Sequence, residues 1–344
     1  MKMQKRKYCA GMIIVIGMVL SWTSVPAAPI ELNLSLIIPK VHNRYVHVID
    51  PWVKMIQERT KGQVKINPYF SNTLAPTPEI YDTTVSGLAD ISEGVSYGTP
   101  GRFPLTETIM LPEIGLRSSL SCSRALWQLY KTFPEVKAEY SNVKMLWLHA
   151  SPPLKLITKR KPVRTLGDLK GLKIWITGAT PVRTAKALGF TPVTMAPGDV
   201  YVALERGPID GAAADNELVI SRRFLEVSKY FIDIDLTQVA FFVLMNQKSW
   251  NNLPREIQKV FDEATGDWAV DFSGRIRDQQ EKAAEKVARA SGMEYITISA
   301  EEKNRIRTIL GSVKDDYAAE LETKKLPGKK VLEELMKIAE KSVE

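Results

Sequence analysis

The stretch LKIWITGATPVRTAKALGFTPVT (residues 172–194) decides the fold. Its first five residues, 172–176, are a short apolar run that predicts a buried strand. Thr180 and Pro181 predict a helix start, because threonine is a good N-cap and proline is tolerated in the first turn. A second short strand is predicted at 192–194. A strand, a helix and a strand in this order form the repeating unit of a mostly parallel α/β sheet.

The rest of the chain repeats this alternation. Strands are predicted at 32–36, 64–66, 89–91, 143–149, 209–211 and 241–244, and helices at 46–60, 78–88, 198–206, 254–291 and twice within 300–344. Thr77 is the expected cap of the second helix, and Pro51 implies a kink or a late start in the first. The polar helix at 254–291 is long enough to bridge two lobes.

The N-terminus predicts export. Four basic residues and no acid occupy residues 1–8, an apolar segment follows from 9 to 20, and small residues lead to Ala27. This arrangement is typical of a signal peptide, and its core is shorter than the about 20 residues that span a bilayer. We expect cleavage after Ala27, with an uncleaved membrane anchor as the alternative. Cys9 precedes the apolar core, which disfavours a lipoprotein.

The composition of the mature chain limits its possible partners and the ways in which it can be stabilised. Removing the leader reduces the formal net charge from +8 to +4, with acids and bases interleaved. No basic stripe for nucleic acid is present, and the modest positive bias favours anionic solutes. Cys122 is the one thiol left, so no intramolecular disulfide is expected. Stability must therefore come from a core, and about 317 residues suggest two lobes.

Motifs for catalysis and metal binding are nearly absent. No zinc motif, P-loop or G-x-G-x-x-G occurs, and His42 and His47 are five residues apart, off one helix face. Residues 94–98 (GVSYG) match the G-x-S-x-G of hydrolases, with Ser96 as nucleophile. The following TPGR sequence is a poor helix start, however, and His149 is the one histidine downstream. We therefore expect no enzyme, cofactor or metal, and interpret 94–98 as a loop near a ligand cleft.

Several further motifs, in order, resemble one family. They are ERTKG (58–62), LP (111–112), LGDLKGLKI (166–174), ALGFTPVTM (187–195), DVYVALE (199–205) with IDG (209–211), and WNNLP (250–254). Over residues 31–325 the chain resembles the TRAP transporter solute-binding proteins, of the dicarboxylate-binder type. The resemblance implies a two-lobed α/β periplasmic binding protein (flytrap) fold, with mixed, mostly parallel sheets and a long lobe-spanning helix. It also implies a small and a large integral membrane subunit as partners.

The resemblance implies lobe boundaries too. The signal peptide is residues 1–27. Lobe 1 is expected at 28–152 plus about 240–279, and lobe 2 at 153–239 plus about 280–325. A C-terminal helix is expected at 326–344.

One position departs from the family pattern. The family usually has an arginine directly after GLK-x on the strand, where it clamps the ligand carboxylate, but this chain has Trp175. Trp175 is either a wall for an aromatic ligand or a core residue. A second arginine of some acid-binding family members falls on or next to Lys155, which is either a carboxylate partner or a solvated lysine. The family's asparagine after DG falls at Ala214, so Asp215 or Asn216 is expected to reach the ligand instead.

The sequence therefore predicts a ligand site without the usual clamp. The candidate ligand-binding residues are Trp175, Lys155, Asp215, Asn216, Tyr97, Arg183, Phe241 and His42, with Phe242 as a further aromatic side chain. We expect a periplasmic binder of an organic acid, favouring an aromatic or apolar monocarboxylate. A neutral or amine solute, a sensor without a transporter and a secreted hydrolase are the alternatives, and monomer and homodimer are both left open.

Overall fold

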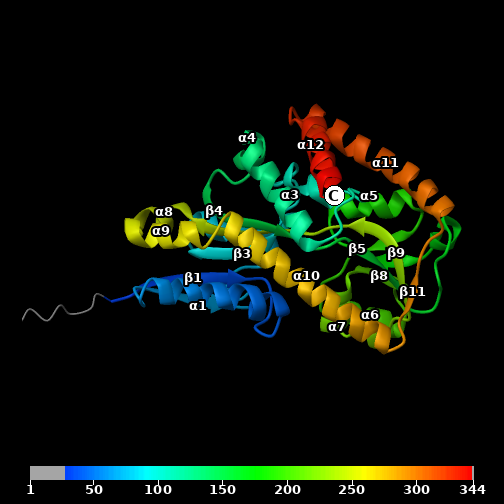
Figure 1. The fold of residues 1–344 in the computed structure, drawn as a ribbon, viewed down its shortest axis with the longest axis horizontal. Coiled ribbons are helices and arrows are strands. Elements are labelled where there is room, and N and C mark those ends of the chain that lie inside the picture. Colours follow the sequence, from blue (N-terminus) through cyan, green and yellow to red (C-terminus); the bar gives the residue numbers. More distant parts are fainter. Residues whose placement is uncertain (1–27, 343–344) are drawn as a thin grey trace, which may run out of the picture.

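The computed structural model describes residues 28–342, which form two mixed β-sheets covered by helices (Figure 1). The leader predicted at 1–27 lies outside the described residues. The first sheet has the order β2-β1-β3-β10-β4, and the second the order β11-β9-β5-β8-β6-β7. The strands of the first sheet are β1 Ile30–Leu36, β2 Val64–Tyr69, β3 Ile91–Val95, β4 Val143–Ala150 and β10 Ala240–Asn246. Those of the second are β5 Leu154–Thr158, β6 Lys173–Trp175, β7 Thr191–Val193, β8 Gly211–Ala214, β9 Tyr230–Thr237 and β11 Glu294–Ile296.

The chain passes between the two sheets through neighbouring strands. β4 leads into β5 through residues 151–153, and β9 leads into β10 through 238–239. β10 then pairs antiparallel with both β3 and β4, while β1 pairs parallel with β2 and β3. Two short crossings explain why the sequence has no recognisable linker. The predicted two-lobed α/β fold with mixed sheets is confirmed.

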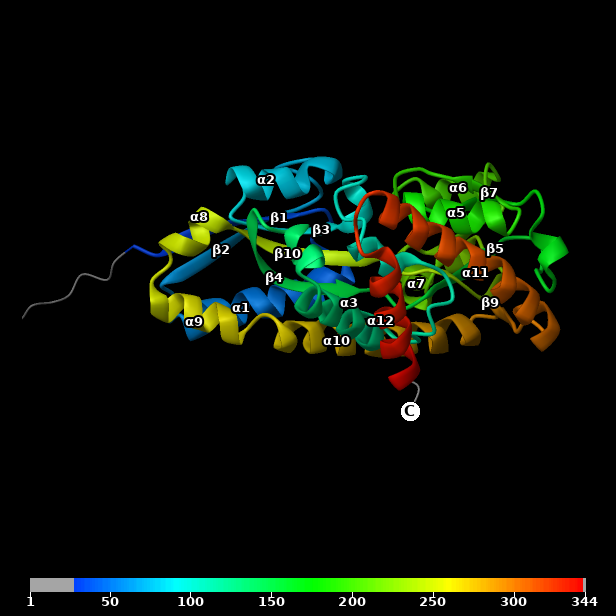
Figure 2. The same cartoon turned by 90° about the horizontal axis from the view of Figure 1, so that it is seen from above.

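Helices cover both sheets, and one of them runs along both (Figure 2). The helices are α1 Asp50–Arg59, α2 Ile80–Ser86, α3 Ser119–Thr132, α4 Pro134–Ala138, α5 Ala179–Ala187, α6 Val200–Arg206, α7 Asn216–Ser221, α8 Gln247–Asn252, α9 Arg255–Glu263, α10 Asp267–Ala290, α11 Ala300–Thr323 and α12 Gly328–Lys341. α10 contacts α3 and β4 of the first lobe and α7 of the second. α11 packs on α5, and α12 returns to α3.

Three local predictions were wrong, and a fourth concerns Pro51. The helix predicted at 254–291 is two helices, because Gly266 takes a positive φ of 57° and donates its N–H to Leu146. Neither Thr77 nor Thr180 caps a helix, since Pro76 and Gly178 occupy the N-cap positions. Pro51 lies in the first turn of α1, and the regular α-helix starts at Asp50, later than residue 46, after one π-helical turn at Tyr45–Ile49.

Two apolar clusters hold the lobes. The larger fills the first lobe and continues along one face of the second sheet. The smaller lies on the opposite face of the second sheet, where Ile157, Trp175, Ala212 and Phe231 meet α6 and α7. Strand register places these four residues on one face, since Ala212 is opposite both Trp175 and Ile157, and Ile157 is opposite Phe231. Cys122 is buried and unpaired, and none of the described helices is long and apolar enough to cross a membrane.

Close packing of α10 on α3 gives a test of the fold. A Cβ on Gly274 would lie 2.6 Å from the Cα of Leu120, which is backbone and cannot move aside. Gly274→Ala should therefore lower the free energy of unfolding by about 1–3 kcal/mol. Gly311, within α11, has no atom within 4 Å of an added Cβ. Gly311→Ala should instead raise stability by about 0.5–1 kcal/mol, because alanine is the better helix former. Urea denaturation of both variants measures the contrast, and equal effects would contradict this packing.

Candidate solute-binding site

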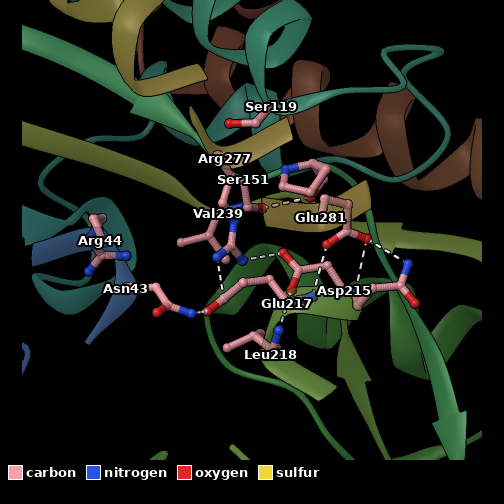
Figure 3. Close-up of polar contacts among 12 residues, drawn as sticks. Asn43, Arg44, Ser119, Ser151, Asp215, Glu217, Leu218, Val239, Arg277 and Glu281 are labelled. Carbon is pink, nitrogen blue, oxygen red and sulfur yellow. Dashed lines mark hydrogen bonds and ion pairs between the residues drawn. The ribbon is translucent and has the colours of Figure 1, made fainter. Parts of the chain in front are cut away.

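Arg277, on α10, forms the centre of a charged network between the lobes (Figure 3). Its guanidinium contacts the carboxylates of Asp215 and Glu217, at the start of α7. Glu217 also accepts a 2.7 Å hydrogen bond from Asn43 of the first lobe. Both carboxylates are almost completely buried, whereas the Arg277 side chain is 18% exposed. The network therefore joins α10, the second lobe and the turn after β1.

Glu281 extends this network by one helical turn. It accepts the backbone N–H groups of Asn216 and Glu217, both at 2.9 Å, and the Asn216 side-chain amide at 2.7 Å. Asp215 caps the same helix by accepting the Leu218 N–H at 2.9 Å. Burial, reinforced by Asp215, raises the pKa of Glu281 to about 7. Burial opposes ionisation of Glu217 as well, but Arg277 lowers its pKa to about 2.

A second cation, Arg44, lies over the face of the first sheet. Phe241 is opposite Val95 and His149 in the strand register, and Glu93 is two residues from Val95, so these side chains share one face. The Arg44 guanidinium is 4.1 Å from the Phe241 ring centre, and its Nε is 2.7 Å from a Glu93 carboxylate oxygen. The Phe241 and His149 rings stack at 4.9 Å. Arg44 thus contacts an aromatic surface and a buried acid together.

A narrow cavity lies between this sheet face and α10. Its lining includes Arg44, His149, Phe241, Arg277 and Gln280. Its volume is about 30 Å³, enough for water but not for an aromatic ring. Burial, followed by the charge of Arg44, lowers the pKa of His149 well below its ordinary value, so this imidazole is neutral. The cavity therefore combines two arginines, a neutral histidine and an aromatic ring.

Several of the predicted site residues meet at this junction. Asp215, Asn216 and Phe241 belong to the contacts above. His42 accepts the Arg44 backbone N–H at 3.0 Å, and burial together with Arg44 lowers its pKa to about 3. Tyr97 packs against Gly178 of the second lobe, where an added Cβ would lie 3.2 Å from the Cβ of Tyr97. The lobes are thus in contact on this side.

Trp175, Arg183 and Phe242 lie away from this junction. Trp175 is 9% exposed in the smaller core, and its indole N–H donates to the Met195 carbonyl at 3.2 Å. Arg183 forms an ion pair with Glu320 on α11. The structure does not bring these two side chains into the Arg277 network. Phe242, the further aromatic candidate, is completely buried in the core of the first lobe.

Lys155 lies in a different, larger cavity. This cavity of about 590 Å³ is bounded by β9, β11, α10 and α11. The Lys155 ammonium contacts both Asp233, at 2.6 Å, and Asp235. Asp233 also contacts Lys303 at 2.7 Å, so two carboxylates balance two ammonium groups, which leaves little net attraction for an anionic ligand.

Ser96 lacks the surroundings of a catalytic serine. It lies in a buried 3₁₀ turn, Ser96–Gly98, and its hydroxyl donates to the Met110 sulfur at 3.4 Å. No histidine is among its hydrogen-bond partners in residues 28–342. The same part of the chain contains no cluster of metal-ligating side chains.

Sequence reasoning missed the principal charged residues of the site. Arg277 and Glu281 are one turn apart on a helix that was predicted, so their spacing signalled a shared face. Glu93 is an acid within the apolar strand β3, and an acid on a buried strand is rare enough to mark a site. Arg44, in the turn after β1, had no distinguishing pattern.

Comparisons with known proteins agree with this architecture. Residues 37–321 match the family of bacterial extracellular solute-binding proteins, family 7. The chain is 26% identical to the 2,3-diketo-L-gulonate-binding periplasmic protein of Escherichia coli over 71% of this chain and 74% of that protein. It is similar to a marine metagenome TRAP solute-binding protein specific for aromatic acid ligands, solved with metahydroxyphenylacetate and with 3-hydroxybenzoate. For the first complex the TM-score is 0.85 at 25% identity, covering 91% of this chain and 99% of that one.

A second solved structure gives the same result. A TRAP periplasmic solute-binding protein of Desulfovibrio salexigens superposes with a TM-score of 0.82 at 29% identity, covering 91% of this chain and 97% of that one. The match to the family extends over most of the described residues and both lobes. The chain therefore belongs to the bacterial extracellular solute-binding proteins of family 7, the solute-binding proteins of TRAP transporters.

Proposed function

We propose that this protein captures an aromatic or apolar monocarboxylate outside the cytoplasm and delivers it to the small and large membrane subunits of a TRAP-type transporter. The observation that carries the ligand class is Arg44, whose guanidinium lies over Phe241 in a cavity that Arg277 and His149 also line. An arginine binds a carboxylate through two parallel hydrogen bonds, and an aromatic ring offers the rest of the ligand a flat apolar surface. The binding of aromatic acids by the similar marine protein supports this class.

The missing family arginine supports the same conclusion. At its position stands Trp175, whose N–H is already occupied by Met195. Cations at the lobe junction come from other elements, among them Arg44 after β1 and Arg277 on α10. A ligand carboxylate held by Arg44 would approach from the first lobe, so a simple dicarboxylate clamped in the usual way is not the expected ligand.

An amine or neutral solute is the less favoured alternative. Asp215, Glu217 and Glu93 supply negative charge for a cation, but each of them is already paired with an arginine. Binding an amine would require breaking such a buried pair, which is costly. An acid meets the same ion pairs, but the Arg44 guanidinium lies over the Phe241 ring, which suits a carboxylate on an apolar body.

Ligand entry requires the lobes to separate. The cavity of about 30 Å³ is too small for a six-membered ring, and Asn43 and Tyr97 hold the lobes together beside it. We place the bending at the two crossings, 151–153 and 238–239, with residues 28–152 and about 240–279 moving as one lobe. Family relatives are periplasmic, and we propose that residues 1–27 direct this chain to the same compartment and are removed after Ala27.

A ligand screen tests the proposal. The mature protein should melt at a higher temperature with 3-hydroxybenzoate, benzoate or phenylacetate, because binding to the folded state alone stabilises it. At a ligand concentration 100 times Kd the gain is about 2.7 kcal/mol. Thermal-shift assays against aromatic acids, small dicarboxylates and amines make the comparison. Stabilisation by dicarboxylates alone, or by amines alone, would rule out the proposed ligand class.

Two variants identify the carboxylate partner. Arg44→Ala should weaken binding of an aromatic acid about 30-fold or more, because a charge-assisted bidentate contact contributes about 2–3 kcal/mol. Lys155→Ala should change Kd less than about threefold, because Asp233 and Asp235 already compensate this lysine. The sequence-based hypothesis for Lys155 predicts the reverse order. Isothermal titration of both variants decides between them.

A further inference from the structure

Glu93 and Arg44 form a buried pair that is in contact but poorly hydrogen-bonded. Glu93 is completely buried on β3, and its nearer carboxylate oxygen is 2.7 Å from Arg44 Nε. Yet neither oxygen of Glu93, nor Arg44 Nε, has a hydrogen-bond partner of acceptable geometry. Buried polar groups in proteins are nearly always satisfied, and exceptions call for an explanation.

Two more unsatisfied groups lie close to this pair. His149 Nε2 and Gln280 Nε2 are buried without a hydrogen-bond partner, and both residues line the narrow cavity with Arg44. His149 shares the sheet face of Glu93 through the register of β3, β10 and β4. A cation, an aromatic ring and unpaired polar nitrogens thus surround one small space. This combination fits a carboxylate with an apolar body, and it differs from the arginine-on-strand arrangement that is usual in the family.

We infer that Glu93 holds the place of the ligand: it pairs with Arg44 in the empty protein, and on binding the ligand carboxylate takes Arg44 while Glu93 takes up a proton from solvent. The inference rests on the proposed function, since it requires an anionic ligand. No covalent bond to the ligand forms or breaks, and the proton that Glu93 gains balances the negative charge that the ligand brings.

The surrounding charges support proton uptake at Glu93. Burial raises the pKa of Glu93, and the charge of Arg44 opposes that rise. A ligand carboxylate on Arg44 removes part of this opposition and adds a second negative charge, so the pKa of Glu93 must rise further. His42 and His149 are neutral near pH 7, since their pKa values are lowered to about 3 and well below the ordinary value.

Other charged groups face the same space. Burial raises the pKa of Tyr97, and the charges of Arg44 and Arg222 only partly oppose this rise, so Tyr97 is uncharged. Asp215 and Glu217 are held by Arg277. Burial also raises the pKa of Asp215, and it raises the pKa of Glu281 to about 7. Any test must therefore separate Glu93 from Glu281.

The inference predicts tighter binding at lower pH. The bound state holds more protons than the free state, so the dissociation constant must fall as pH falls, by at most about tenfold per pH unit for one proton. Titration calorimetry with 3-hydroxybenzoate at about pH 6, pH 7 and pH 8 measures this slope, because the ligand carboxyl group, with a pKa near 4, stays ionised throughout. Repeating the titrations in buffers of different ionisation enthalpy measures the protons taken up.

Glu93→Gln is the decisive variant. Glutamine has the shape of the protonated acid and leaves Arg44 free for the ligand. We expect it to bind 3-hydroxybenzoate about tenfold more tightly than the wild type at about pH 8, and to lose most of the pH dependence and proton uptake. Circular dichroism and thermal melting verify that the variant folds.

Matched controls separate Glu93 from other buried acids. Glu139→Gln removes another buried carboxylate, one whose pKa is raised to about 7 by burial. This carboxylate accepts hydrogen bonds from Leu105 and Thr106, away from Arg44. The variant should leave both affinity and slope unchanged. A slope that disappears in Glu281→Gln and persists in Glu93→Gln would assign the proton to Glu281 and overturn the inference.

The remaining outcomes distinguish the inference from the proposed function. If the wild type binds the acid and Glu93→Gln changes neither its affinity nor its slope, the inference fails and the proposed function stands. If the wild type binds no aromatic acid at any of these pH values, the inference and the proposed function are both wrong.

Discussion

The ion pairs of Arg277 with Asp215 and Glu217 are the interaction on which the rest of the structure depends. Arg277 belongs to the helix that runs beneath both lobes, and its two partners begin the helix at the cleft edge of the second sheet. Removing one member of a buried pair leaves an uncompensated charge, at a cost of about 3–5 kcal/mol. The edge of the second lobe is therefore fixed to α10, and lobe movement must bend elsewhere.

Glu281 strengthens this attachment through backbone groups. The first N–H groups of a helix have no acceptor within the helix. In α7 the carboxylates of Glu281 and of the cap residue Asp215 accept these hydrogen bonds. A six-residue helix has little stability of its own. Its position is therefore set by α10, which also packs closely on α3 through Gly274. Backbone proximity and buried charge act together to define one wall of the cleft.

The opposite wall comes from the first lobe and has a different character. There Arg44 covers Phe241, and Glu93 is in contact but lacks well-formed hydrogen bonds. The Arg277 network is geometrically complete, whereas the Arg44 pair retains unused hydrogen-bonding capacity. A rigid wall opposite a wall with exchangeable partners suits a binding protein, because the ligand can replace an internal contact without dismantling the fold.

The sequence by itself determined the α/β alternation, the family and the compartment hypothesis. These depend on local signals: apolar runs at 172–176 and 241–244, and motifs of fixed spacing. Local signals also led to errors of detail, since Thr180 has the chemistry of a cap but bonds Glu107 of the other lobe instead. Trp175 stands where the family resemblance led us to expect an arginine. Its packing in the smaller core was one of two readings that the sequence left open.

Only the tertiary structure decided which charges meet. Arg277 is about sixty positions from its partners, Arg44 is 49 positions from Glu93, and Asn43 is 174 from Glu217. Periodicity reports which face of an element is buried, but it does not report what that face touches. The contacts follow from two crossings of the chain between sheets and from the course of α10. Lys155 illustrates the limit: no local pattern shows that Asp233 and Asp235 contact it, because these contacts depend on how β9 pairs with β5.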